Sequence, residues 1–194
     1  MQDLSIPVHV LIRPRSGDFT YSDDDFEIMK EDIQLCKELG CAGIVSGVLH
    51  QDNTIDLQRT KELVEISQPL NFTFHRAFDW IVNPLESLRQ LEEIGVNRVL
   101  TSGQELTAEN GISLLTSLKD ETKVTIMPGG GIHGDNVLLF REAGFSEIHL
   151  SATQQNQTIE VPKISMNSLK HFEETQISTS DIKTIQNILS KINA

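Results

Sequence analysis

The chain has 194 residues, of which 38% are hydrophobic, enough for one domain with a buried core and too few for a second. It carries 28 acidic against 16 basic residues, a formal charge of −12. This charge argues against a nucleic-acid partner or an anionic membrane surface, because both require a basic face. We therefore predict a single domain over residues 1–194 with neither kind of partner.

Neither a membrane anchor nor a secretion signal is evident in the sequence. No apolar stretch approaches the length of a membrane span, and the opening residues MQDLSIPVHV lack the basic, apolar and small-residue order of a signal peptide. The two cysteines, Cys36 and Cys41, form no evident disulfide framework and suit a reducing compartment. These features predict a cytoplasmic protein.

Strand-like and helix-like segments alternate along the chain. Six short apolar runs are predicted as strands, at residues 8–12, 43–48, 72–75, 98–101, 124–127 and 148–150. Helices are predicted after them, at residues 24–39, 57–66, 84–94, 112–118 and 135–143, with a last one near 180–192. The polar stretch after Thr153 predicts a loop or lid before that last helix. Such a succession is typical of βα units in a parallel sheet.

Two of these helices carry clear terminal signals. Ser22 and Asp23 are candidate caps for the first helix, and Gly40 is its stop. Asn83 followed by Pro84 combines a cap with a first-turn proline, and the apolar residues after it recur at helical spacing. These signals predict where the connecting segments between strands begin and end.

Each apolar run ends in a polar or glycine-rich tip, and in parallel sheets the C-terminal strand ends build the site. Side chains alternate along a strand, so His9, Leu11 and Arg13 share one face of the first strand. By the same count Thr73 and His75 share the corresponding face of the third strand. We therefore expect Arg13 and His75 to meet.

His75 is the main candidate for chemistry, because it lies at a tip with Arg76 and Asp79 close after it. We predict His75 as a hydrogen-bonding or proton-transfer group and Arg76 and Asp79 as the neighbours that orient it. Strand alternation points Arg76 outward unless the strand has already ended. If the site is catalytic, its residues are predicted to be His75, Arg13 and Asp79.

The other basic tips allow more than one interpretation. Arg13 and Arg15 are either clamps on an anionic ligand or solvated residues paired with a local acid such as Asp18. His9 and His149 sit lower in their strands, and we expect them to be hydrogen-bonded core residues.

The run MPGGGI is the second candidate feature. Successive glycines at Gly129, Gly130 and Gly131 let backbone amides approach a phosphate or carboxylate, and the following helix would direct its positive end to the same place. Ser102 and Ser151, on neighbouring tips, would flank this anion site. The alternative is a tight strand-to-helix turn that needs positive φ.

Metal chemistry has little support in the sequence. Cys36 and Cys41 are separated by a helix terminus, the four methionines are not clustered, and the histidines show no HxxxH or HxH spacing. No dinucleotide fingerprint or P-loop is present either, since GGGIHG lacks the required Lys and Ser/Thr. We predict no metal ligands in this chain.

The tips also carry a family resemblance. The strings IRPRSGDFTYSDDDF, GIVSGVL, FTFHRAFD, RVLTSGQ and MPGGGI, in this order and spacing, resemble the CutC family of copper homeostasis proteins over residues 6–152. The resemblance implies a (β/α)8 barrel of the TIM type in a cytoplasmic, often homo-oligomeric protein with a link to copper tolerance or Cu(I) binding. Copper as a cofactor is therefore implied by the resemblance alone, and no particular reaction is implied.

An α/β barrel of this type has eight strands, and the sequence predicts six. Members of the family begin with two further βα units, which carry the cysteines invoked for copper, so those ligands have no counterpart here. With six strands, the first and last would be open edges. We expect an incomplete or misassigned start in preference to cover from another chain or from the tail after Gln154.

Three functions stay open at this point. They are a copper-binding homeostasis protein, an enzyme that acts on a small anionic or phosphorylated metabolite, and a non-catalytic assembly module. We predict a small anionic ligand, bound at the C-terminal face of the barrel by residues among Arg13, Arg15, Arg76, Ser102, Gly129, Gly130, Gly131 and Ser151.

Overall fold

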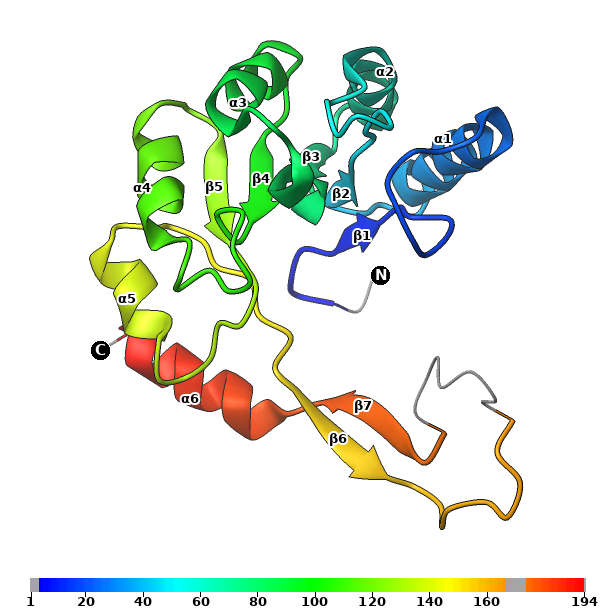
Figure 1. Cartoon of the computed structure of the whole chain (residues 1–194), viewed down its shortest axis with the longest axis vertical. Coiled ribbons are helices and arrows are strands. Elements are labelled where there is room, and N and C mark those ends of the chain that lie inside the picture. Colours follow the sequence, from blue (N-terminus) through cyan, green and yellow to red (C-terminus); the bar gives the residue numbers. More distant parts are fainter. Residues whose placement is uncertain (1–3, 167–173, 194) are drawn as a thin grey trace.

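A five-stranded parallel sheet forms the centre of the protein, in the order β1-β2-β3-β4-β5 (Figure 1). The computed structural model describes residues 4–166 and 174–193. The strands are β1 (His9–Leu11), β2 (Gly43–Ser46), β3 (Asn71–Phe74), β4 (Arg98–Thr101) and β5 (Thr125–Pro128). Each pairs in parallel with the next, as expected for serial βα units.

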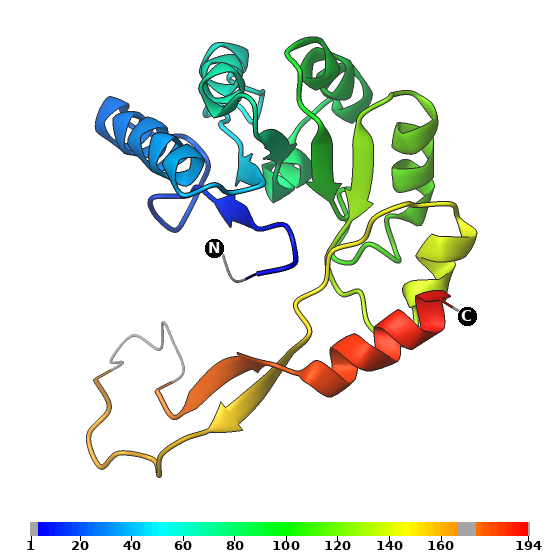
Figure 2. The same cartoon turned by 180° about the vertical axis from the view of Figure 1, so that it is seen from behind.

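Helices connect the strands along one side of the sheet, as Figures 1 and 2 show from opposite directions. They are α1 (Asp23–Glu38), α2 (Leu57–Ser67), α3 (Pro84–Glu93), α4 (Ile112–Asp120) and α5 (Val137–Glu142), with a short 3-10 helix η1 (Arg76–Trp80) after β3. The predicted cap of α1 is confirmed, because the Ser22 side chain accepts from the Asp25 amide. Asn83 precedes α3, with Pro84 in its first turn, but its side chain makes no capping hydrogen bond.

Strand alternation divides the sheet into two faces, as the sequence predicts. Phe72 and Phe74 are fully buried on the side that α2 and α3 cover. Thr73 and His75 belong to the opposite face, together with His9 and Leu11 of β1. The apolar helix-facing side forms the core, and the other side is available to build a site.

The sixth predicted strand, residues 148–150, is not formed. A single parallel bridge joins Gly129 to His149, with the His149 amide donating to Pro128 O at 2.8 Å. Ala152 then adopts a φ of 44°, in the left-handed region, and turns the chain away from the sheet. The segment therefore extends the sheet past β5 by one residue only.

The polar stretch after Ala152 forms a hairpin in place of the predicted loop. Strand β6 (Thr153–Gln157) pairs antiparallel with β7 (Gln176–Ser180), and the hairpin projects away from the main sheet (Figure 1). Cross-strand side chains add to the ladder, with Asn156 Nδ2 donating to Thr179 Oγ1 at 2.6 Å. Because its residues are polar on both faces, the alternation that marks an amphipathic strand is missing.

The predicted last helix is confirmed as α6 (Ile182–Asn193), which packs on α5 through the buried Ile188. Lys191 Nζ donates to Gly134 O at 2.5 Å, fastening the end of α6 to the loop before α5. Among the described residues, no helix combines the length and the apolar character needed to cross a membrane.

Candidate functional site

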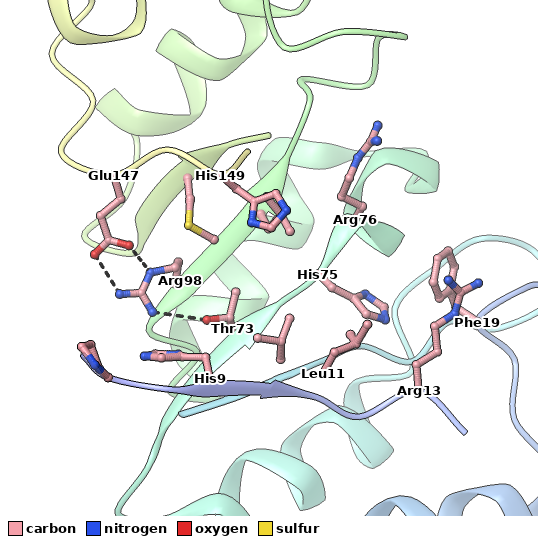
Figure 3. Close-up of a pocket in the computed structure, with 14 residues that line it drawn as sticks. His9, Leu11, Arg13, Phe19, Thr73, His75, Arg76, Arg98, Glu147 and His149 are labelled. Carbon is pink, nitrogen blue, oxygen red and sulfur yellow. Dashed lines mark hydrogen bonds and ion pairs between the residues drawn. The ribbon is translucent and has the colours of Figure 1, made fainter. Parts of the chain in front are cut away.

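The face of the sheet opposite the helices lines a cavity of about 640 Å³, here called the inner cavity (Figure 3). Its walls are mostly apolar, built by Pro7, Leu11, Phe19, Val45, Leu100 and Met127. The polar residues that line it are His9, Arg13, Thr73, His75, Arg76, Arg98, Glu147 and His149. Volumes of 300–1,000 Å³ with apolar walls and a few polar groups are typical of small-molecule sites.

An ion pair occupies the end of the inner cavity at the strand N-termini. Arg98, the first residue of β4, binds the Glu147 carboxylate through Nε and Nη2, the latter at 2.8 Å from Oε1 (Figure 3). Its Nη1 donates to Thr73 Oγ1 at 3.3 Å. Since the two charges neutralise each other, this end of the cavity offers little net charge to a ligand.

His75 lies at the opposite end, where β3 becomes η1. Its Nδ1 accepts from the Ala77 amide at 3.3 Å, so the neutral ring carries its proton on Nε2. Nε2 is buried and makes no hydrogen bond within the described residues. Burial, with a smaller contribution from the Arg13 charge, lowers the pKa of His75 to about 4. His75 is therefore a neutral donor at pH 7 with an unused N–H.

Phe19 contacts both His75 and Arg13, a role that the sequence does not predict. The Phe19 ring lies 4.7 Å from the His75 ring, centroid to centroid, and the Arg13 guanidinium carbon lies 4.7 Å from the Phe19 centroid. Arg13 also donates from Nη2 to Gly17 O at 2.6 Å. Arg13 and His75 thus line the same cavity wall, as expected, and the Phe19 ring contacts both, tilted by 55° from the imidazole (Figure 3).

Arg76 is fixed in place by Asp79 and Ser102. Its Nε donates to Asp79 Oδ2 at 2.7 Å and its Nη2 to Ser102 Oγ at 2.9 Å. Because β3 ends at Phe74, Arg76 belongs to η1 and lines the inner cavity. Strand alternation, which would have pointed Arg76 outward, therefore does not apply to it. Asp79, whose side chain is 8% exposed, lies beneath this guanidinium.

The carboxylate of Asp79 is saturated by protein donors. It accepts from Thr101 Oγ1 at 2.5 Å, from the Ser102 amide at 2.9 Å and from the Gln104 amide at 3.2 Å, in addition to Arg76. Asp79 therefore orients Arg76 and the loop after β4. The prediction that Arg76 and Asp79 orient His75 is not supported, because the hydrogen bond that holds the His75 ring within the described residues comes from the Ala77 amide.

A second, smaller pocket of about 340 Å³, the outer pocket, adjoins the inner cavity. Arg76 and His149 line both. The rest of the outer pocket is formed by Gly130, Gly131, Ile132, His133, Leu150, Ser151, Ala152, Thr153 and Thr184. The predicted gathering of Arg76, Gly130, Gly131 and Ser151 is thus found here, next to the inner cavity.

The predicted cradle of three glycine amides is only partly available. The Gly129 amide donates to Thr101 O at 2.9 Å and belongs to the sheet, and Gly129 lines neither pocket. Gly130 and Gly131 have φ of 117° and 69°, so the turn does require positive φ. Helix α5 has only six residues and starts at Val137, so the expected contribution of a helix N-terminus is absent from this loop.

Arg15 lies away from both pockets. Its guanidinium binds Asp18 at 2.8 Å and Asp25 at 3.3 Å and stacks on Tyr21, with the guanidinium carbon 5.2 Å from the ring centroid. Of the two interpretations, the structure thus favours the local ion pair for Arg15. Ser102, predicted to bind the ligand, lines neither pocket; its hydroxyl oxygen accepts a hydrogen bond from Arg76 instead.

His9 and His149 are not the hydrogen-bonded core residues expected from their strand positions. Both line the inner cavity, and His149 is exposed (Figure 3). Desolvation lowers the pKa of each ring, and the nearby guanidinium, Arg98 for His9 and Arg76 for His149, lowers it further. Alternation along the first strand places His9 on the same face as Arg13, and this is the signal that could have identified it as a cavity residue.

Sequence reasoning also missed Arg98 and Glu147. They are 49 residues apart, and only the fold brings the start of β4 beside the segment after α5.

The described residues contain no group of three or more His, Cys, Asp or Glu side chains placed to hold a metal ion. Cys36 and Cys41 are buried free thiols. Burial and the neighbouring Cys41 raise the pKa of Cys36 to about 11. A thiol of this kind stays protonated at pH 7 and is a poor ligand for a soft metal ion.

Comparison with known proteins gives a consistent relationship. The model of the CutC family matches residues 1–154. A CutC family protein of Proteus mirabilis is 48% identical over 151 residues, which cover 77% of this chain and 60% of that protein. One of Erwinia tasmaniensis is 39% identical over 193 residues, which cover 96% of this chain and 77% of that protein. The chain thus spans 60% of the length of the Proteus relative.

Solved structures confirm the fold class. A protein of Streptococcus agalactiae, provisionally named as the copper homeostasis protein CutC, superposes with a TM-score of 0.71 at 34% identity, over 74% of this chain and 72% of that one. Dihydrodipicolinate synthase of Bacillus anthracis gives a TM-score of 0.52 at 15% identity, over 77% of this chain and 48% of that one, a likeness of fold alone. The five parallel strands with outer helices are an open part of a (β/α)8-type barrel.

Proposed function

This chain belongs to the CutC family, and we propose that its part in copper homeostasis, the role named for its relative from S. agalactiae, is to bind a small anionic molecule in the inner cavity. The observation that carries this proposal is the buried Nε2–H of His75, which has no acceptor within the described residues. A buried donor without a partner costs free energy, and a ligand oxygen would satisfy it.

The other polar groups at this end of the cavity are also donors. Arg76 adds a positive charge at the border between the inner cavity and the outer pocket, with its Nε and Nη2 engaged by Asp79 and Ser102. Arg13 donates from Nη2 to Gly17 O and lies close to the Tyr21 hydroxyl, and the rest of its guanidinium borders the inner cavity. Glu147, the carboxylate among the lining residues, is taken by Arg98. Donors that converge without acceptors favour a carboxylate or phosphate ligand.

Copper itself does not fit the residues described. The two thiols are buried, and the raised pKa of Cys36 disfavours the thiolate that Cu(I) requires. The proposal therefore places the chain's contribution in anion binding and derives no step through copper. Two free thiols support a reducing, cytoplasmic location as part of the same proposal.

An enzyme acting on the bound anion is the second candidate, and the protonation state of His75 favours it. A neutral imidazole that donates a hydrogen bond from Nε2 can polarise a carbonyl oxygen of the ligand. Turnover of a bound ligand that is lost in His75→Gln would distinguish an enzyme from a binding protein.

Benzoate is a suitable probe for the proposed site, because its ring matches the apolar walls and its carboxylate the donors. Arg13→Gln and His75→Gln are each expected to weaken benzoate binding about tenfold, the effect of losing one charge-assisted hydrogen bond. Isothermal titration calorimetry at low salt measures this change.

Arg89→Gln is the matched control, because Arg89 lies on α3 with an exposed side chain paired to Glu121. It should bind benzoate as the unmodified protein does. Equal affinity in all three variants, or no binding of benzoate to the unmodified protein, contradicts the proposed function.

A further inference from the structure

The outer pocket and the inner cavity are neighbours that share two lining side chains. Arg76 and His149 line both spaces, one from η1 and the other from the segment after α5. A ligand larger than a single anion can therefore occupy both, with one polar group at each end. The anion site expected from the sequence and the His75 site therefore lie on either side of Arg76 and His149.

The outer pocket has the electrostatic character of an anion subsite. Its lining includes the Arg76 guanidinium and two histidines but no Asp or Glu, in a chain of net charge −12. The amide of Gly131 and the hydroxyl of Ser151 donate no hydrogen bond to another described residue. Thr184 is already engaged, since its Oγ1 donates to Asp181 Oδ2 at 2.5 Å.

Glycine at position 130 keeps the space between the guanidinium and the backbone open. A Cβ there would lie 3.4 Å from Arg76 Nη1 and 3.3 Å from Ser102 Cβ. Arg76 cannot move away easily, because Asp79 and Ser102 hold its other two nitrogens. Nη1 of Arg76 therefore faces a small space bounded by the glycine loop and Ser151.

A phosphate group matches this arrangement better than a carboxylate does. The donors come from three separate segments, η1, the glycine loop and the Ser151 loop, and so approach from different directions. A phosphate monoester offers three peripheral oxygens in a tetrahedral arrangement, whereas a carboxylate offers two oxygens in one plane. Glycine-rich loops with positive φ commonly receive phosphate in this way.

We infer that the ligand of this site is a phosphate monoester that carries a second acceptor group, with its phosphate in the outer pocket and its second group on His75 and Arg13 in the inner cavity. This inference rests on the proposed function, because it uses the His75 end as one of two subsites. The carbon body between the two groups would lie against the apolar wall formed by Leu100 and Met127.

Three probes that share one benzene ring test the inference. They are 4-carboxyphenyl phosphate, with both groups, phenyl phosphate, with the phosphate alone, and benzoate, with the carboxylate alone. The compound with both groups should bind at least about tenfold more tightly than either of the others. Calorimetric titration of each probe into the full chain gives the three dissociation constants.

Ser151→Asp places a negative charge in the outer pocket without touching the inner cavity. It should weaken both phosphate compounds by about tenfold or more and leave benzoate unchanged. Ser113→Asp, the same change at an exposed position in the first turn of α4, should leave all three affinities as they are. Arg13→Gln should weaken benzoate and the double-headed compound but not phenyl phosphate.

The binding results distinguish failure of this inference from failure of the proposed function. If benzoate binds and the phosphate brings no gain, or if Ser151→Asp weakens benzoate as much as the phosphate compounds, the inference fails while the proposed function stands. If none of the three probes binds, both fail together.

Discussion

Replacing Asp79 by alanine should lower the free energy of unfolding by about 2–3 kcal/mol, the cost of leaving several hydrogen-bond donors without a charged acceptor. The Arg76 side chain, which is 44% exposed, can still be hydrated, so the loss should be smaller than for a fully buried ion pair. The carboxylate accepts from Arg76 Nε, Thr101 Oγ1 and the amides of Ser102 and Gln104, all within 3.2 Å. Alanine leaves these donors without an acceptor in a place that water reaches poorly, since the Asp79 side chain is 8% exposed.

Urea denaturation followed by circular dichroism measures the change in unfolding free energy. Asp120→Ala is the matched control, because that carboxylate is 69% exposed at the end of α4 and should change stability by less than about 0.5 kcal/mol. A loss below about 1 kcal/mol in Asp79→Ala, with an unchanged m-value, would show that the loop after β4 is held by other contacts.

His75 should make the protein less stable in acid by about 3 kcal/mol, the equivalent of lowering its pKa from 6.5 to about 4 on folding. The unfolded chain takes up the proton first, near pH 6.5, and the folded protein only near pH 4. The protein therefore keeps this stability in full above pH 6.5 and loses it as the pH falls from 6.5 to 4. Below about pH 4 the loss is complete and does not grow further.

The difference in unfolding free energy between the unmodified protein and His75→Gln isolates this contribution, because other groups titrate equally in both. That difference should shift by about 3 kcal/mol in favour of the variant between pH 7 and pH 4. A difference that stays constant over this range would mean that His75 is already accessible to protons in the folded protein.

Much of the arrangement around His75 follows from local sequence rules. Alternation along two strands predicts Arg13 and His75 on one face, and both line the inner cavity. The strand β3 ends at Phe74, where its apolar run ends in the sequence. Both rules act over a few residues. They hold because the helix-facing side of a parallel strand must be apolar, which leaves polar residues to the other face.

Other parts of the site depend on long-range contacts that no local rule contains. The ion pair of Arg98 with Glu147 forms only once β4 and the chain after α5 are adjacent. Arg15 is the same residue type as Arg13 and lies at the same strand tip. Its guanidinium nevertheless binds Asp18 and Asp25, which are close enough to pair with it. The choice between a ligand and a local acid is decided by distances of a few ångströms.

The polar hairpin was missed for a different physical reason. Its strands present polar residues on both faces, so their pairing is specified by backbone bonds and amide side chains and not by burial. The short α5 likewise departs from its predicted range, because the turn before it uses the Asn136 side chain to hold the Gly131 carbonyl at 3.0 Å.

The hairpin of β6 and β7 has a consequence for how the protein opens. It makes its main contacts within itself and adds little to the buried core, so its amides should exchange with solvent through local separation of the two strands, well before the sheet unfolds. Thr153 begins this hairpin and Thr184 follows it, and both border the outer pocket. One rim of that pocket therefore includes Thr153, the first residue of this hairpin, and occupancy there should slow hydrogen exchange along the hairpin.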